Sequence, residues 1–168
     1  MPDYIIVGGG SAGCTIAGRL SEDECVSVVL FEGGPSDSSP WIHLPATYYK
    51  TCKGKLLQRF KLEPLRHQNN VETDTGQARV LGGGSSINGM IYIRGCPQDF
   101  DRWAESGAVG WSYKDVLPFF KKAEGNERFS NDHHGSDGPL SVSDQRQTLP
   151  LTKAWLKACQ EAGIPYNP

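Results

Sequence analysis

The sequence predicts an α/β fold in which helices pack on a parallel β-sheet. One observation is the order of patterns near the N-terminus: an apolar run at 4–7, a glycine-rich turn, helical spacing from Ser11, and an apolar run at 26–31. Short apolar runs of this kind are typical of strands buried on both faces of a parallel sheet. The other observation is the glycine content, 20 of 168 residues, against a usual share of about 7%. Strand, turn, helix and strand together form the smallest unit that binds a dinucleotide.

The first turn carries a specific glycine pattern, in which Gly8, Gly10 and Gly13 are spaced as GxGxxG. The first glycine permits a tight turn, the second lets the backbone approach a pyrophosphate, and the third lets helix and strand pack closely. The helix N-terminus then stabilises the phosphates, with Ser11 placed to add a hydroxyl. Glu32 follows the second strand, where its carboxylate can accept from both ribose hydroxyls and would repel a 2'-phosphate. The unit therefore predicts NAD or FAD and disfavours NADP.

The remainder of the chain alternates weak and clear patterns. Residues 35–77 read as an extended excursion with at most short strands around 57–65. Helices are expected from Pro97 to Gly107 and from Ser112 onward, and the clearest helical period covers 151–162 before Gly163. Three tryptophans are expected to fill core: Trp103, Trp111 and Trp155.

The predicted sheet is incomplete. No second strand, helix and strand unit follows Phe31, although a doubly wound sheet needs several parallel strands. The expected architecture is therefore Rossmann-like, an incomplete doubly wound parallel sheet whose missing strands come from elsewhere.

Composition excludes several classes of function. A net charge of -2 gives no long-range attraction to nucleic acid. No stretch approaches the roughly 18 apolar residues of a membrane span, and no basic and apolar leader precedes the first strand. The five cysteines lack CxxC spacing, which argues against disulfides and zinc and favours a reducing, cytoplasmic location. His133 and His134 lack the i+2 or i+4 spacing of metal ligands, so no metal site is expected.

A second glycine-rich block spans residues 78–95, with bare amides from Gly82 to Ser86 and Asn88 beside them. This block resembles the first signature of the glucose-methanol-choline (GMC) oxidoreductase family. The matching positions are Ala78, Arg79, Leu81, Gly82, Gly83, Gly84, Ser85, Ile87, Asn88, Tyr92, Gly95 and Asp101. Further matches at Trp103, 110–113, 117–120 and 134–140 extend the resemblance over nearly the whole chain, closest to the choline dehydrogenase-like branch.

The resemblance implies FAD in extended form, with its pyrophosphate at the first glycine turn and its adenosine ribose at Glu32. The second block would meet the flavin ring along residues 88–91, and Gly82 and Gly83 would lie on the ribityl or phosphate side. Ile87 stands where members with covalent flavin carry histidine, so we expect non-covalent FAD. The predicted cofactor-binding residues are Gly8, Gly10, Ser11, Ala12, Gly13, Glu32, Gly33, Val80, Gly82, Gly83, Asn88, Gly89, Met90 and Ile91.

The family resemblance also implies a reaction, the oxidation of an alcohol CH–OH group by hydride transfer to flavin. The histidine base of family members lies near their C-terminus, so we expect no catalytic residue in this chain and no activity from it alone. Its partners would be a small alcohol and the remainder of the same enzyme, as a C-terminal part or a second chain. Residues 1–95 would form the N-terminal part of the FAD-binding domain, and 96–168 a helical extension that begins an α+β substrate domain. The alternatives are a flavin-containing hydroxynitrile lyase on the same scaffold and a non-catalytic FAD-binding fragment.

Overall fold

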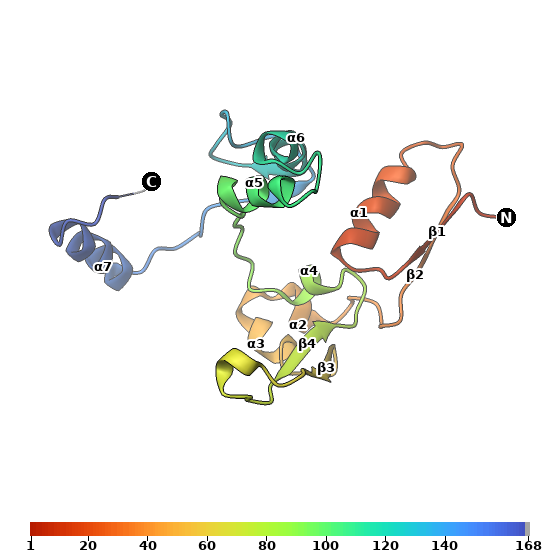
Figure 1. Cartoon of the computed structure of the whole chain (residues 1–168), viewed down its shortest axis with the longest axis horizontal. Coiled ribbons are helices and arrows are strands. Elements are labelled where there is room, and N and C mark those ends of the chain that lie inside the picture. The colour runs from red at the N-terminus through yellow and green to blue at the C-terminus, as the bar shows by residue number, and fades with distance from the viewer. Residues whose placement is uncertain (167–168) are drawn as a thin grey trace. The chain divides into compact units, whose positions relative to one another are not determined.

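The computed structural model describes residues 1–166 and confirms the mixed α/β class (Figure 1). The chain divides into two compact units, Met1–Ile91 and Tyr92–Pro168. Among the described residues, the first unit contains two two-stranded sheets and the second unit one, and each unit has its own helices.

The first unit begins with the strand, helix and strand order that the sequence predicts. Strands β1 (Tyr4–Val7) and β2 (Val28–Phe31) pair in parallel, and helix α1 (Ser11–Leu20) connects them. The second strand starts two residues later than the apolar run suggests. The reason is local, because the Val26 amide donates to the Asp23 carbonyl at 3.0 Å and keeps Val26 in a turn.

The expectation that both strands are buried on two faces is wrong for this chain by itself. Val7 is 86% exposed, Ile5 62% and Phe31 57%. The sheet has only these two strands, and α1 is the helix that contacts both of them. The apolar pattern is therefore that of a buried parallel sheet, while the residues that would cover it are not among those described.

The excursion between the two glycine blocks is more ordered than expected. Strand β3 (Leu57–Lys61) confirms the predicted short strand and pairs antiparallel with β4 (Asp74–Ala78). Short helical turns were not predicted; they are α2 (Pro40–His43), η1 (Pro45–Thr47), α3 (Tyr48–Thr51), η2 (Arg66–Gln68) and α4 (Gly84–Ile87). The buried apolar side chains of this unit are Val80, which has no exposed area, and Ile87, at 6%.

The second unit contains the three predicted helices and one unpredicted strand pair. The helices are α5 (Pro97–Glu105), α6 (Tyr113–Ala123) and α7 (Pro150–Glu161). Strands β5 (Glu124–Asn126) and β6 (Leu140–Val142) pair in parallel and have three residues each, too few to show a sequence period. Its core centres on Phe100, which is 8% exposed and packs edge to face on Phe120 at a ring-centroid distance of 5.4 Å.

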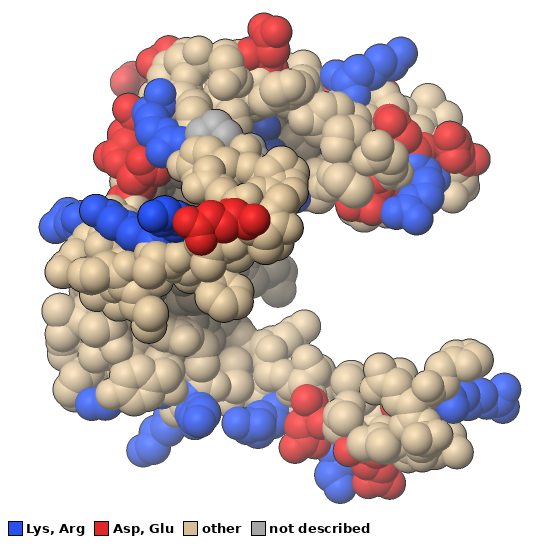
Figure 2. Space-filling model, turned by 90° about the vertical axis from the view of Figure 1, so that its left-hand side faces the viewer, with Lys and Arg blue, Asp and Glu red and all other residues tan. Residues whose placement is uncertain are grey.

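The prediction that three tryptophans fill the core is wrong for the described residues. Trp103 and Trp111 are each 52% exposed and Trp155 is 69% exposed. Helix α7 keeps the predicted apolar stripe but buries none of its residues. Figure 2 shows charged side chains in separate groups, with wide uncharged areas between them. Each unit thus carries exposed apolar residues that its own elements do not cover.

Candidate cofactor site

The N-terminus of α1 is open to a ligand. Gly10 caps this helix without any side-chain hydrogen bond, and the first intrahelical bond runs from the Cys14 amide to the Gly10 carbonyl at 2.9 Å. The preceding amides have no partner in the helix, and they carry the positive end of the helix dipole. These are the amides of the predicted residues Ser11, Ala12 and Gly13. Backbone donors in this arrangement bind phosphate oxygens.

Two glycines of the fingerprint are sterically required. Gly8 has a φ of +99°, in the left-handed region that side chains disfavour. A Cβ built on Gly13 would overlap the Gly8 carbonyl oxygen, so the helix can approach the turn this closely only without a side chain. The roles that the sequence assigns to these two glycines, a tight turn and close packing, match this geometry.

The second glycine block packs directly on the first. The Gly82 amide donates to the Gly9 carbonyl at 2.7 Å, and the hydroxyls of Ser11 and Ser85 are hydrogen-bonded at 2.7 Å. A Cβ on Gly83, whose φ is +55°, would lie 2.7 Å from the Gly10 Cα. The sequence placed both blocks on one cofactor but did not predict that they touch each other. The sequence feature that could have indicated this contact is the small side chains of both blocks, which permit two backbones to approach closely.

Glu32 lies beside the first turn and holds it. Its two carboxylate oxygens accept the amides of Gly9 and Gly34, each at 2.7 Å. The side chain is half-buried, and its oxygens retain lone pairs for further donors. Bonding to ribose hydroxyls stays a prediction, and the structure adds a second role for Glu32 in fixing the turn.

Two other predicted cofactor-binding residues, Gly33 and Val80, offer main-chain groups and no side chain to a ligand. The Gly33 carbonyl accepts the Arg79 Nε at 3.1 Å, which ties the end of β2 to the start of the second block. The Val80 side chain is fully buried, so it fills core and leaves only its main chain for a ligand.

The predicted flavin-edge residues lie at the end of the first unit. The Asn88 Oδ1 accepts the Met90 amide at 2.7 Å, while Met90 takes a φ of +58°. Met90 is 56% exposed and Ile91 is 83% exposed, and no atom would lie within 4 Å of a Cβ on Gly89. The cavity lined by Asn88 and Met90, together with Trp41, has a volume of about 60 Å³, against roughly 300–1,000 Å³ for typical ligand sites. The described residues therefore present this edge without enclosing a ring.

The site as a whole fits the ADP half of a dinucleotide. It combines an uncapped helix N-terminus, two interlocked glycine turns and a carboxylate at the end of the neighbouring strand. A parallel strand, helix and strand unit with this site defines the class of dinucleotide-binding α/β proteins.

Comparison with known proteins narrows this class. Residues 2–168 match the model of the GMC oxidoreductase family, and the chain belongs to that family. One solved structure similar to this chain is that of an FAD-dependent oxidoreductase from Chaetomium thermophilum, which is 31% identical with a TM-score of 0.80, over 97% of this chain and 30% of that protein.

Similar curated proteins are all much longer than this chain. An alcohol dehydrogenase [acceptor] of Pseudomonas putida is 43% identical over 169 residues, which are 99% of this chain and 31% of the relative. An oxygen-dependent choline dehydrogenase of Sinorhizobium fredii is 43% identical over 163 residues, 96% of this chain and 30% of the relative. The mitochondrial choline dehydrogenase of Homo sapiens is 41% identical and covers 98% of this chain and 29% of its own length. The chain thus spans about a third of these relatives.

Solved structures show the same fold. Pyridoxine 4-oxidase from Mesorbium loti superposes with a TM-score of 0.87 at 32% identity, over 98% of this chain and 33% of that protein. A formate oxidase gives a TM-score of 0.85 at 28% identity, over 98% of this chain and 31% of its own.

Residues 1–166 contain neither a membrane-spanning helix nor a cluster of metal ligands. No helix in that range combines the length and apolar character needed to cross a bilayer. Nor do three or more His, Cys, Asp or Glu side chains there converge as metal ligands would. The Nδ1 of His134, one of the two adjacent histidines, is instead 2.9 Å from a carboxylate oxygen of Glu124.

Proposed function

We propose that this chain is the cofactor-holding N-terminal part of a longer flavoenzyme that oxidises the CH–OH group of an alcohol. The observation that carries the proposal is the uncapped N-terminus of α1, with Glu32 fixed beside it. The relatives support the substrate class, since those reported are an alcohol dehydrogenase and choline dehydrogenases. We also infer a reducing, cytoplasmic location, because all five cysteines are free.

The residues of this chain act in binding and orientation. The first amides of α1 hold the pyrophosphate, and Glu32 accepts the ribose hydroxyls while keeping the turn in shape. Gly82 and Gly83 bring the second block against the phosphate turn, and Asn88 to Ile91 present polar and apolar groups to the flavin edge. When bound, FAD supplies the hydride acceptor. The base that removes the hydroxyl proton is assigned to the remainder of the enzyme.

Anaerobic addition of alcohols to the FAD-loaded enzyme tests the proposal. Alcohol oxidation reduces the flavin, so the yellow absorbance should bleach on addition of a primary alcohol or choline and return with an electron acceptor. The same solution should be unchanged by an ether of equal size, which has no hydroxyl proton to lose. An enzyme that cleaves cyanohydrins without bleaching would support the lyase alternative. A chain that binds FAD but never bleaches, even with the longer polypeptide supplied, would support the non-catalytic alternative.

We expect the flavin to be released by acid. Ile87, at the position of the covalent attachment, offers no nucleophile, and its side chain is only 6% exposed. Acid precipitation of the loaded enzyme should therefore leave a colourless pellet and a yellow supernatant containing intact FAD. A pellet that stays yellow after washing would contradict non-covalent binding.

A further inference from the structure

The second unit has a polar groove that shares no residue with the proposed cofactor site. Its volume is about 400 Å³, within the roughly 300–1,000 Å³ of small-ligand sites. The polar side chains that line it are Lys121, Lys122, Ser130, Asn131, His134, Ser136 and Asp137. We propose that this groove binds a small oxyanion, the phosphate, sulfate or carboxylate group of a ligand.

The groove is shaped by glycines that let a loop close on the end of α6. A Cβ on Gly135 would overlap the Lys121 carbonyl, and a Cβ on Gly138 would overlap the backbone of Ala123. The Gly138 amide also donates to the Glu124 carbonyl at 2.9 Å. The walls are therefore fixed by close backbone contacts between the loop and the helix end.

Two adjacent lysines supply positive charge to this groove. Neither Lys121 nor Lys122 forms an ion pair with any residue in the range 1–166. Lys121 is half-buried and Lys122 is exposed. The negative end of the α6 dipole stabilises both ammonium groups at this position, so they are retained without a carboxylate partner. Lys121 and Lys122 both line the groove, and their positive charges favour an anion there.

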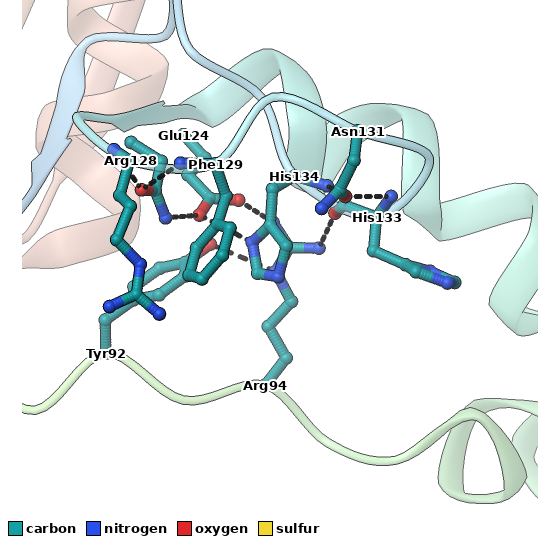
Figure 3. A network of polar contacts seen from close by, with 9 residues as sticks. Tyr92, Arg94, Glu124, Arg128, Phe129, Asn131, His133 and His134 are labelled. Carbon is teal, nitrogen blue, oxygen red and sulfur yellow. Dashed lines mark hydrogen bonds and ion pairs between the residues drawn. The ribbon is translucent and has the colours of Figure 1, made fainter. Parts of the chain in front are cut away.

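His134 adds a donor whose orientation is fixed. Its Nδ1 lies 2.9 Å from the Glu124 Oε1, and its ring packs on Phe129 at a centroid distance of 5.4 Å (Figure 3). An ionised carboxylate only accepts hydrogen bonds, so Nδ1 carries the proton and Nε2 is the nitrogen left for a ligand. Once protonated, Nε2 becomes a third positively charged donor.

Glu124 is committed to the opposite side of this ring. It has no exposed area, and it also accepts from Arg94 and, at 2.8 Å, from the Nδ2 of Asn126. The Arg94 charge balances that of Glu124, so the pair does not repel an anion in the groove.

One acidic side chain limits where an anion can bind in the groove. Asp137 also lines the groove, and its carboxylate accepts the Ser136 hydroxyl at 3.2 Å. Ser136 is in turn 3.4 Å from the Ser130 hydroxyl. An oxyanion would therefore sit toward the lysines and His134, and removal of the Asp137 charge should strengthen its binding.

Sulfate is a suitable probe because it is a fully ionised oxyanion near neutral pH. Sulfate added to the isotopically labelled full chain should cause saturable NMR shifts at Lys121, Lys122 and residues 134–138. Chloride at equal ionic strength should not cause them.

Matched substitutions distinguish sulfate binding in the groove from a general effect of salt. Lys122→Gln should weaken sulfate binding by about fivefold, the size of one exposed charge interaction. Asp137→Asn should strengthen it by a similar factor. Lys114→Gln, an exposed lysine on the same helix outside the groove, should leave it unchanged. Comparison of inorganic phosphate with acetate then identifies the favoured head group.

Two results would overturn the proposal. One is a wild-type chain whose groove signals respond equally to sulfate and chloride. The other is a Lys114→Gln variant that weakens sulfate binding as much as Lys122→Gln does.

Discussion

Replacement of Gly13 by alanine is expected to abolish FAD loading. The new Cβ would overlap the Gly8 carbonyl oxygen, and neither group is at the flexible end of a side chain. Relief requires the helix N-terminus to move away from the turn, which costs about 1–3 kcal/mol and also displaces the amides that we propose bind the pyrophosphate. A loss of about 3 kcal/mol corresponds to roughly 100-fold weaker binding. The measurement is the FAD content of the purified enzyme and its affinity in a reconstitution titration.

Gly18 in the same helix provides the matched control. A Cβ at Gly18 meets nothing within 4 Å, and alanine in a helix interior is favoured over glycine by about 1 kcal/mol. Gly18→Ala should therefore keep full FAD loading and unfold at an equal or higher temperature. If the two variants bind FAD equally well, the phosphate turn does not depend on the close contact at Gly13.

Replacement of Glu124 by glutamine is expected to cause the largest loss of stability in the second unit. Glu124 is fully buried and accepts from Arg94, Asn126 and His134 (Figure 3). The Arg94 side chain is itself only 11% exposed, so the variant leaves a buried guanidinium without its counter-charge. Breaking a buried pair in this way costs about 3–5 kcal/mol. Urea unfolding at neutral pH measures it, and Glu105→Gln on the exposed surface of α5 should change stability by less than about 0.5 kcal/mol.

The same carboxylate gives this stability a pH dependence. Burial acts to raise the pKa of Glu124, but the hydrogen bonds from Asn126 and His134 and the charge of Arg94 outweigh it and hold the pKa below its ordinary value of 4.5. A lowered pKa in the folded state means that the contribution is complete above pH 4.5 and is lost as the pH falls further. The wild-type chain should therefore lose stability more steeply in acid than Glu124→Gln. Parallel acid limbs for the two proteins would contradict this assignment.

Sequence patterns predicted the elements whose information is local. The helix from Ser11 ends at Leu20, and the last helix ends just before Gly163, which has a φ of +84°. Each depends on a period and on flanking residues that lie within about a turn. The two glycine blocks were likewise singled out from their glycines, and their assignment to one cofactor stays a prediction.

Other features depend on contacts between distant residues and left no local signal. The Gly82 to Gly9 hydrogen bond joins main-chain groups, which the sequence does not distinguish. The Glu124 cluster draws on Arg94, 30 residues before it, and His134, ten residues after it. The sequence analysis overestimated the burial of Val7 and Trp155 for a different reason. An apolar pattern indicates which side chains favour burial, but it does not show whether a neighbouring element covers them.

The hydrogen bonds that join the two ends of the excursion affect how much the length of this segment can change. The Leu81 amide donates to the Pro35 carbonyl at 2.9 Å and the Arg79 side chain to the Gly33 carbonyl, so the chain leaves the end of β2 and returns to the same place. The closure entropy of a flexible loop rises by only about 0.6 kcal/mol for each doubling of its length. Segments of different length can therefore connect these two ends at small thermodynamic cost. Residues 36–78 are in this sense open to insertions, because residues can be added there while the hydrogen bonds that join the two ends are kept.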